Sequence, residues 1–148
     1  MFVSLTPRQQ GDFGEISAIE WLGYRGASVG VPFGHSPNWD LMAELEGRVM
    51  RVQVKTSGVL RNGRWYVAIC TRGGNQSWNG MTKVIDPARC EYLFVLVGDG
   101  RRWFIPTRAL EARTKLCLGG PKYSEYEVEP GRPFADRRCR RTALQSPI

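Results

Sequence analysis

The sequence predicts a single α/β domain in which an N-terminal helix covers a β-hairpin of a central sheet. One observation is an amphipathic segment over residues 7–22 whose apolar residues recur at helical spacing. Another is a pair of alternating, strand-like runs on either side of Glu46–Gly47. The chain has 148 residues, of which 42% are hydrophobic and 24% charged, as expected for one globular domain with a sizeable core.

The predicted helix has a start signal and a stop signal. Thr6 is placed as the N-cap, Pro7 occupies the first helical position, and Gln9 closes a capping box with Thr6. We expect Gly23 to cap the C-terminus. The residues expected to form the buried face recur every three positions, and they are Phe13, Ile16, Ile19 and Leu22.

The two strand-like runs form a hairpin if Glu46–Gly47 is a two-residue turn, which also determines the register. One face of the hairpin then consists of apolar side chains, namely Trp39, Leu41, Ala43, Leu45, Met50, Val52 and Val54. The other face gathers polar side chains, namely Asp40, Glu44, Arg51, Gln53 and Lys55. The opposed pairs are Leu45 with Arg48, Ala43 with Met50, Leu41 with Val52, and Asp40 with Gln53, with about 5 Å between opposed side chains.

The polar face of this hairpin suits the hydrolysis of a phosphodiester bond. A hard divalent cation such as Mg²⁺ takes oxygen ligands and typically only one or two protein carboxylates. Asp40 is a candidate anchoring carboxylate, and the side-chain carbonyl of Gln53 is a candidate neutral ligand. Lys55 can orient a water molecule or stabilise the charge of the transition state. The alternative interpretation is the solvent-facing side of an edge hairpin without chemistry.

A carboxylate on the first helix adds to this candidate site. Glu15 borders the apolar face of the helix, where a negative charge is costly unless a cation or a metal lies nearby. Glu20 lies near the opposite margin and competes for the same role. Either acid can instead reach solvent or pair with an arginine, and the sequence leaves these alternatives open.

A resemblance to a known family rests on three places in the sequence, namely G-D-F-G-E at residues 11–15, Asp40, and Q-V-K at residues 53–55. In these places the chain resembles the PD-(D/E)XK nuclease superfamily. The chain looks most similar to the branch with glutamine in the third acidic position, which includes a group I intron homing endonuclease. The resemblance implies a restriction-endonuclease-like fold, with a mixed central β-sheet flanked by helices, and metal-dependent cleavage of double-stranded DNA. The literal P-D pair is absent, since Pro37 precedes Asp40 by three positions.

The resemblance also implies roles for individual residues. The implied catalytic set is Glu15, Asp40, Gln53 and Lys55, in which Asp40, Gln53 and Glu15 hold Mg²⁺, with Mn²⁺ as an alternative ion. Gln53 stands where relatives have an acid, which removes one negative charge and should weaken metal affinity.

Charge and loop composition favour a DNA partner. The net charge is +7 and the pI is about 9.6, which favours polyanions through counterion release. A glycine-rich polar loop follows the hairpin, and an ordinary surface loop is the alternative interpretation of it. The predicted DNA-binding residues around this loop are Arg61, Arg64, Arg72, Asn75, Gln76 and Lys83, with arginines on phosphates and amides near the bases.

The remaining chain is predicted to form strands and connections. Expected strands cover 27–33, 65–71, 92–97 and 102–105, with 65–71 extending the hairpin, and a short helix is expected over 106–113. We expect a nuclease domain over residues 1–130 and a basic tail over 131–148 that contains the cluster Arg137–Arg141. His35, in the loop before Asp40, is a candidate proton shuttle or an incidental residue.

Other features of the sequence limit the class to which the protein can belong. The four cysteines are 20, 27 and 22 positions apart without a C-x-x-C pair, so a structural zinc site is not expected. Cys70 and Cys90 are expected to be buried thiols of a reducing cytosol. The sequence has no apolar run long enough for a membrane span and no secretion signal, so a cytoplasmic location is expected.

These observations predict a Mg²⁺-dependent endonuclease that acts on double-stranded DNA, with a site-specific nuclease of the homing type as the more specific form of the prediction. A Holliday-junction resolvase, a catalytically inactive DNA-binding module, and an RNA-processing or toxin protein with a nuclease fold remain alternatives. A homo-oligomer, either a dimer or a tetramer, is expected because a chain of this size offers little surface for a long DNA site.

Overall fold

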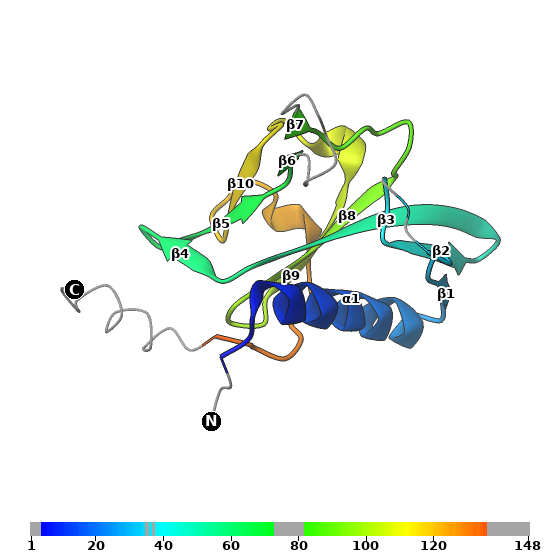
Figure 1. The fold of residues 1–148 in the computed structure, drawn as a ribbon, viewed down its shortest axis with the longest axis horizontal. Coiled ribbons are helices and arrows are strands. Elements are labelled where there is room, and N and C mark those ends of the chain that lie inside the picture. The colour runs from blue at the N-terminus through cyan, green and yellow to red at the C-terminus, as the bar shows by residue number, and fades with distance from the viewer. Residues whose placement is uncertain (1–3, 35, 37, 73–81, 136–148) are drawn as a thin grey trace.

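The computed structural model describes residues 4–34, 36, 38–72 and 82–135, which are arranged in three layers (Figure 1). Helix α1 (Pro7–Tyr24) covers one face of a six-stranded central sheet, and a three-stranded sheet packs on the other face. In spatial order the central sheet contains β1 (Ser28–Gly30), β2 (Leu41–Leu45), β3 (Arg48–Ser57), β8 (Tyr92–Val97), β9 (Arg102–Pro106) and β11 (Glu127–Val128).

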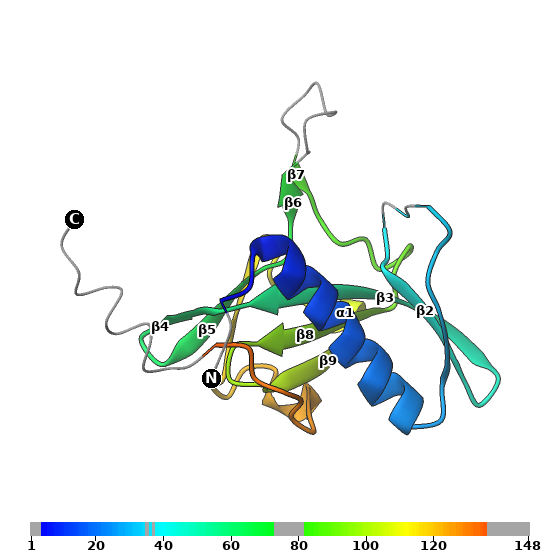
Figure 2. The ribbon, with the colours of Figure 1, turned by 60° about the horizontal axis from the view of Figure 1, so that its bottom comes forward.

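The smaller elements complete the described part of the chain. The three-stranded sheet has the order β10 (Lys115–Leu118), β5 (Arg64–Ala68) and β4 (Val59–Arg61). A separate two-stranded ribbon contains β6 (Thr71–Arg72) and β7 (Thr82–Lys83), and projects away from the layers in Figure 2. Two 3₁₀ turns, η1 (Thr107–Ala109) and η2 (Ser124–Tyr126), follow β9 and precede β11.

The central sheet is mixed, as predicted. Strands β3 and β8 pair in parallel, and the other neighbours in this sheet pair antiparallel. The α/β class with a mixed central sheet is therefore confirmed. The layer opposite α1 consists of strands, whereas the resemblance implied flanking helices.

The predicted hairpin register is confirmed pair by pair. Leu41 lies opposite Val52, Ala43 opposite Met50, and Leu45 opposite Arg48. The turn residues Glu46 and Gly47 have φ values of 52° and 78°. Positive φ at both central positions defines a type I′ turn, whose twist matches that of the two strands it connects.

The start of α1 is confirmed and its predicted end is wrong. Its predicted buried face is correct in part, because Leu22 is buried and Phe13 packs against the core. The capping box between Thr6 and Gln9 is present. The helix continues past Gly23 to Tyr24, and Gly26, with φ of 92°, takes the left-handed position beyond the end. The face against the sheet consists of Gly14, Ser17, Ala18, Trp21 and Leu22, while Ile16 and Ile19 are exposed.

Close packing of α1 on β3 explains the displaced face. A Cβ atom built on Gly14 would lie 2.2 Å from Thr56 Cγ2 and 3.3 Å from Val54 Cγ1. Only small residues fit at the point of closest approach, so Gly14, Ser17 and Ala18 face the strand. The larger Ile16 is turned away, at 60% exposure. The three-residue spacing of large apolar side chains therefore identified only part of the buried face.

Strand β8 supplies side chains to both hydrophobic cores. Leu93, Val95 and Val97 face the three-stranded sheet, where they pack with Trp65 and Trp103. Phe94 and Leu96 face α1, where they pack with Trp21, Leu22 and Val52. Because β8 is paired on both edges and covered on both faces, it forms the rigid centre of the sheet.

Several predicted elements are shorter or differently placed. The first strand covers only 28–30 of the predicted 27–33, and the predicted helix over 106–113 is the single 3₁₀ turn η1. The segment predicted to extend the hairpin at 65–71 instead contains β5, which pairs with β4 and β10 in the other sheet. The chain leaves the central sheet at Ser57, whose hydroxyl donates to the backbone carbonyl of Tyr66.

The C-terminal end of the described chain packs against the domain. The backbone N–H groups of Phe134 and Ala135 both donate to the carbonyl of Gly98, and Phe134 is buried beside α1. The boundary at residue 130 stays a prediction, and the basic cluster of the predicted tail lies outside the described residues. Among the helices that the structure describes, none combines the length and apolarity required to cross a bilayer.

Candidate active site

The hairpin brings Asp40 and Gln53 into direct contact. Asp40 comes immediately before β2, and its backbone N–H donates to the carbonyl of Val52 at 2.9 Å. Its side-chain Oδ2 accepts from Gln53 Nε2 at 2.8 Å and from the backbone N–H of Val54, also at 2.8 Å. The carboxylate is therefore held in one orientation by two donors of β3.

This arrangement leaves oxygen atoms available at the site. Among the described residues, both hydrogen bonds to the Asp40 side chain end on Oδ2, so Oδ1 is available to another partner there. Gln53 donates through Nε2, so its Oε1 remains as well. A carboxylate oxygen and an amide oxygen are suitable ligands for a hard cation. The donor set is therefore of the kind that suits a hard divalent cation, and its role as a metal site stays a prediction.

Glu15 supplies a second carboxylate to the same region. It follows Gly14, the residue at which α1 approaches β3 most closely. Partial burial, together with the negative charges of Asp40 and Asp12, raises the pKa of Glu15 above its usual value. Like charges that lie close together favour the binding of a cation, because the cation relieves their repulsion. In the described part of the chain, no three His, Cys, Asp or Glu side chains form a metal-binding group, and the candidate ligands are two carboxylates and one amide.

Lys55 lies on the same side of β3 as Gln53, as the alternation of a strand requires. Both side chains line a small crevice between β3, the segment before β2 and the chain after β7. The other residues that line the crevice are Asn38, Ile69, Lys83, Val84, Ile85 and Asp86. An ammonium group is therefore placed beside the amide that contacts Asp40.

Two polar residues of this crevice were not predicted. Asn38 lies two positions before Asp40, so their spacing was an available signal that they share one side of an extended segment. Asp86 carried no comparable signal, because it comes from a loop far along the chain. Its side chain accepts from the N–H of Ala88 at 2.9 Å and lies 3.7 Å from Arg89.

The rival acid Glu20 has a different role. It pairs with Arg102, whose side chain is only 4% exposed and also donates to Ser17 and to the carbonyls of Glu129 and Pro130. Glu20 therefore balances a buried guanidinium and is separate from the Asp40 site. Of the two candidates on α1, the structure leaves Glu15 as the carboxylate near Asp40.

Two further residues of the predicted polar face also lie apart from the site. The Arg51 guanidinium pairs with Glu91 at 2.8 Å and donates to the carbonyl of Ala88. Glu44 is exposed on β2. The polar face of the hairpin is thus divided between a structural ion pair at one end and the group around Asp40 at the other.

The predicted DNA-binding residues fall on separate elements. Arg61 and Arg64 are exposed and directly opposed at the end of the β4–β5 hairpin. Lys83 lies on β7 and lines the crevice with Lys55. The backbone of Arg72 pairs with Thr82 in the ribbon of β6 and β7. Asn75 and Gln76, and the candidate proton shuttle His35, lie outside the described residues.

The described cysteines differ in burial. Cys90 is buried, as predicted, and burial raises the pKa of its thiol to about 11. Cys70 is only partly buried, and Cys117 is exposed. The thiol of Cys90 is therefore protonated at neutral pH and unreactive.

Comparisons with known proteins agree with this geometry. A family model described as PD-(D/E)XK endonuclease matches residues 5–123. Among solved structures, the fold is similar to that of a bacterial homing endonuclease, I-Ssp6803I, with a TM-score of 0.64 and 20% sequence identity. This similarity covers 82% of the chain and 87% of the solved one. No curated protein matches.

Proposed function

The chain belongs to the PD-(D/E)XK endonuclease family, and from this membership we propose that it hydrolyses double-stranded DNA in a Mg²⁺-dependent reaction. The observation that carries the proposal is the contact of Asp40 with Gln53, beside Glu15 and on the same strand as Lys55. The fold similarity to a bacterial homing endonuclease supports a site-specific nuclease of the homing type.

The proposed Mg²⁺ ligands are Asp40 Oδ1, Gln53 Oε1 and the carboxylate of Glu15. Mn²⁺ has the same preference for oxygen ligands and can replace Mg²⁺. When bound, the ion supplies positive charge that polarises the phosphate and offsets the charge that develops during attack. Gln53 also orients Asp40 through its Nε2 group, so one amide acts both as a ligand and as a support.

Two lysines of the crevice are placed to assist the hydrolysis of the phosphodiester bond. A water oxygen forms a bond to phosphorus, and the bond from phosphorus to one bridging oxygen breaks. The attacking water gives a proton to solvent, and the leaving oxygen takes a proton from solvent. The Lys55 ammonium is placed to orient the water or to stabilise the added negative charge on the phosphate oxygens. Lys83, in the same crevice, is placed to contact a phosphate next to the scissile one.

The experiment compares several nucleic acids under the same conditions. A pool of DNA duplexes with randomised sequence, a synthetic four-way junction, and RNA are each incubated with the protein in Mg²⁺ and in EDTA. We expect cleaved duplex in Mg²⁺ alone. Preferential cleavage of the junction would replace this proposal with a resolvase, and binding without cleavage in Mg²⁺ or Mn²⁺ would indicate an inactive DNA-binding module.

Two lysine variants test whether the cleavage takes place at this site. Lys55→Ala is expected to abolish cleavage and to keep DNA affinity, because the side chain serves the reaction and contributes little to the core. Lys122→Ala is the matched control, since Lys122 is exposed and pairs with Glu111 away from the crevice. Cleavage by Lys55→Ala at the wild-type rate would contradict the assigned role.

A further inference from the structure

The outer face of the three-stranded sheet carries a concentration of positive charge. Alternation along β4, β5 and β10 directs Trp65, Val67, Leu116 and Leu118 into the core. The side chains on the opposite face are Val59, Arg61, Arg64, Tyr66, Ala68, Lys115 and Cys117. None of the residues in these three strands is acidic.

Tyr66 lies at the centre of this face and holds two cations. The Arg61 guanidinium lies 5.4 Å from the centroid of the Tyr66 ring, and the Lys115 ammonium lies 5.3 Å from it. The ring therefore restricts two long side chains that would otherwise move freely in solvent. Restricted cations lose less conformational entropy when they bind an anion.

The cations of this face differ from those arginines and lysines of the described chain that have an acidic partner. Arg51, Arg101 and Arg102 pair with Glu91, Glu127 and Glu20, and Lys122 pairs with Glu111. Among the described residues, no carboxylate lies within 4.0 Å of Arg61, Arg64 or Lys115. Within that part of the chain, the positive charge of the face is thus left uncompensated.

The β4–β5 hairpin even places two like charges opposite each other. Arg61 and Arg64 are register partners across the Asn62–Gly63 turn, in which both turn residues have positive φ. Like charges that are directly opposed destabilise a strand pair. The tight turn holds this arrangement in place, and a phosphate bound between the two guanidinium groups would relieve their repulsion.

We propose that this face, which we call the Tyr66 face, binds the phosphate backbone of duplex DNA on one side of the cleavage site. The proposal rests on the proposed function and adds Lys115 and Tyr66 to the DNA-contacting residues. Lys115 and Arg61 contact phosphates, and Tyr66 is a positioning residue that holds both. The bound segment is duplex, since Tyr66 is already covered by two cations and is not free to stack with bases.

The distance to the candidate active site fits one continuous duplex. The chain from Lys55 to Arg61 spans at most roughly 20 Å at the rise of an extended strand. This length corresponds to about six base pairs of B-form DNA. The separation along the chain is therefore short enough for one duplex to contact both Lys55 and Arg61.

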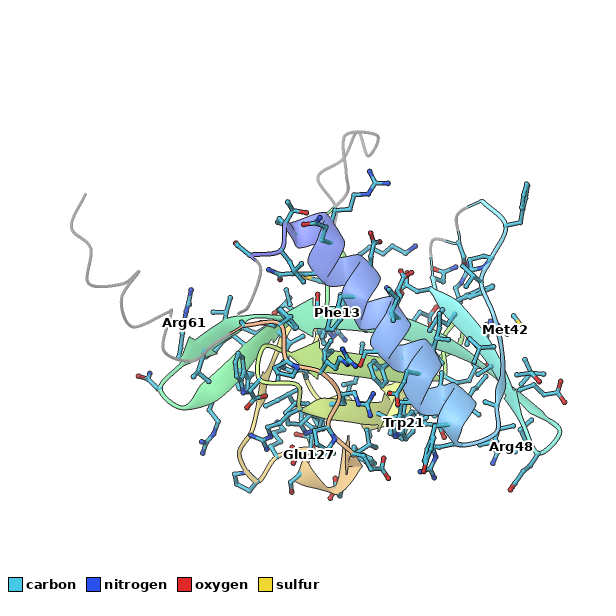
Figure 3. All side chains as sticks on the ribbon, turned by 90° about the horizontal axis from the view of Figure 1, so that it is seen from below. Phe13, Trp21, Met42, Arg48, Arg61 and Glu127 are labelled. Atoms are coloured by element: carbon cyan, nitrogen blue, oxygen red, sulfur yellow. The ribbon has the colours of Figure 1, made fainter. Side chains whose placement is uncertain are left out.

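The test compares two variants with the same net charge. In the first, Arg61, Arg64 and Lys115 are replaced with Ala. In the charge-matched control, the exposed residues Arg48, Arg108 and Arg132 are replaced with Ala. Arg48 lies at the opposite end of the molecule from Arg61 in Figure 3. Fluorescence anisotropy in EDTA measures affinity for a duplex of arbitrary sequence and for one of its strands over a range of salt concentrations.

We expect the first variant to bind the duplex more weakly and to reduce the slope of log affinity against log salt by roughly two to three units. The control is expected to keep a slope close to that of the wild type. Equal slopes in the two variants, while the wild type binds DNA, would overturn the proposal for the Tyr66 face and leave the proposed function unaffected. A loss confined to single strands would also overturn it, whereas a wild-type protein without DNA binding would overturn the proposed function as well.

Tyr66→Leu separates the positioning role from the charges. We expect a smaller loss of duplex affinity than in the first variant, with restoration in Tyr66→Phe, because the phenyl ring still holds both cations. The melting temperature of Arg64→Ala without DNA controls for folding. It is expected to equal or exceed that of the wild type, because a like-charge pair has been removed.

Discussion

Asp40 is the residue around which the candidate site is organised. Its Oδ2 accepts from a side chain and from the backbone of β3, so its position is determined by the hairpin register. A slip of one residue would turn Gln53 to the other face of the sheet and remove both the ligand and the support. The turn at Glu46–Gly47 is therefore as important to the candidate site as the proposed ligands themselves.

Substitutions at Asp40 and Gln53 should have opposite effects on metal binding. Asp40→Asn is expected to lose activity and most of its Mg²⁺ affinity, because a charged ligand becomes neutral. Gln53→Glu is expected to lower the stability of the metal-free protein, because a second carboxylate replaces the donor to Asp40 Oδ2. The same variant should show tighter Mg²⁺ binding and a larger thermal shift on its addition.

Calorimetry with Mg²⁺ and thermal unfolding with and without the ion report these effects. Glu44→Gln is a suitable control, since Glu44 is exposed on β2 and lies apart from the site. Cleavage by Asp40→Asn, combined with unchanged Mg²⁺ affinity in Gln53→Glu, would place the metal site elsewhere.

Glu15 should make the metal-free protein sensitive to pH. Its raised pKa means that the folded state holds the proton more tightly than the unfolded chain does. The stability due to the uncharged carboxyl is present below the usual pKa of 4.5 and is lost as pH rises through the raised value. Glu15→Gln is therefore expected to melt at a higher temperature than the wild type at neutral pH, without metal.

The pH series contains its own control. Well below pH 4.5 the carboxyl is protonated in the folded and the unfolded chain, so the advantage of Glu15→Gln should disappear there. Mg²⁺ should also stabilise the wild type more than the variant at neutral pH. An advantage of Glu15→Gln that is the same at acidic and neutral pH would contradict an electrostatic cause.

At the scale of elements, the packing of α1 on β3 places Glu15. Gly14→Ala is expected to lower the stability by about 1–3 kcal/mol, because the added methyl group would overlap Thr56 Cγ2. Since α1 must move away from β3, Glu15 should also move away from Asp40, and Mg²⁺ affinity should fall. Thermal unfolding and calorimetry measure the two effects.

Gly11 offers a matched control on the same helix. A Cβ atom on Gly11 meets no atom within 4 Å, so Gly11→Ala should raise the stability by about 1 kcal/mol through helix propensity alone. Equal effects of the two substitutions would mean that α1 and β3 are not held in close contact. The pair of variants thus separates packing from helix propensity.

At the scale of the whole molecule, one chain carries one candidate site. A break in both strands of a duplex needs two sites, which a symmetric homo-oligomer provides. We predict a dimer or a tetramer, measured by sedimentation equilibrium. Supercoiled plasmid that contains the target should be linearised directly, and dilution to the monomer should produce nicked circles instead. A monomer that linearises plasmid in one binding event would contradict this expectation.

Several features of the fold and the site were predictable because they are encoded locally. The capping box uses residues three positions apart, the turn needs positive φ at two neighbouring positions, and the alternation of β2 and β3 defines their faces. From these, the sequence predicted the hairpin register and the opposition of Asp40 and Gln53. The position of Lys55 beside Gln53 follows from the same alternation.

The sequence by itself determined the start of α1, the register of the hairpin of β2 and β3, and the excess of positive charge, because each depends on neighbouring residues or on composition. Only the tertiary structure decided which face of α1 is buried, whether Glu15 or Glu20 lies near Asp40, and which sheet receives the segment after Ser57. These outcomes depend on contacts between distant residues, such as Gly14 with Thr56 and Glu20 with Arg102. Spacing along the chain carries no record of such contacts, because they form only when the layers pack.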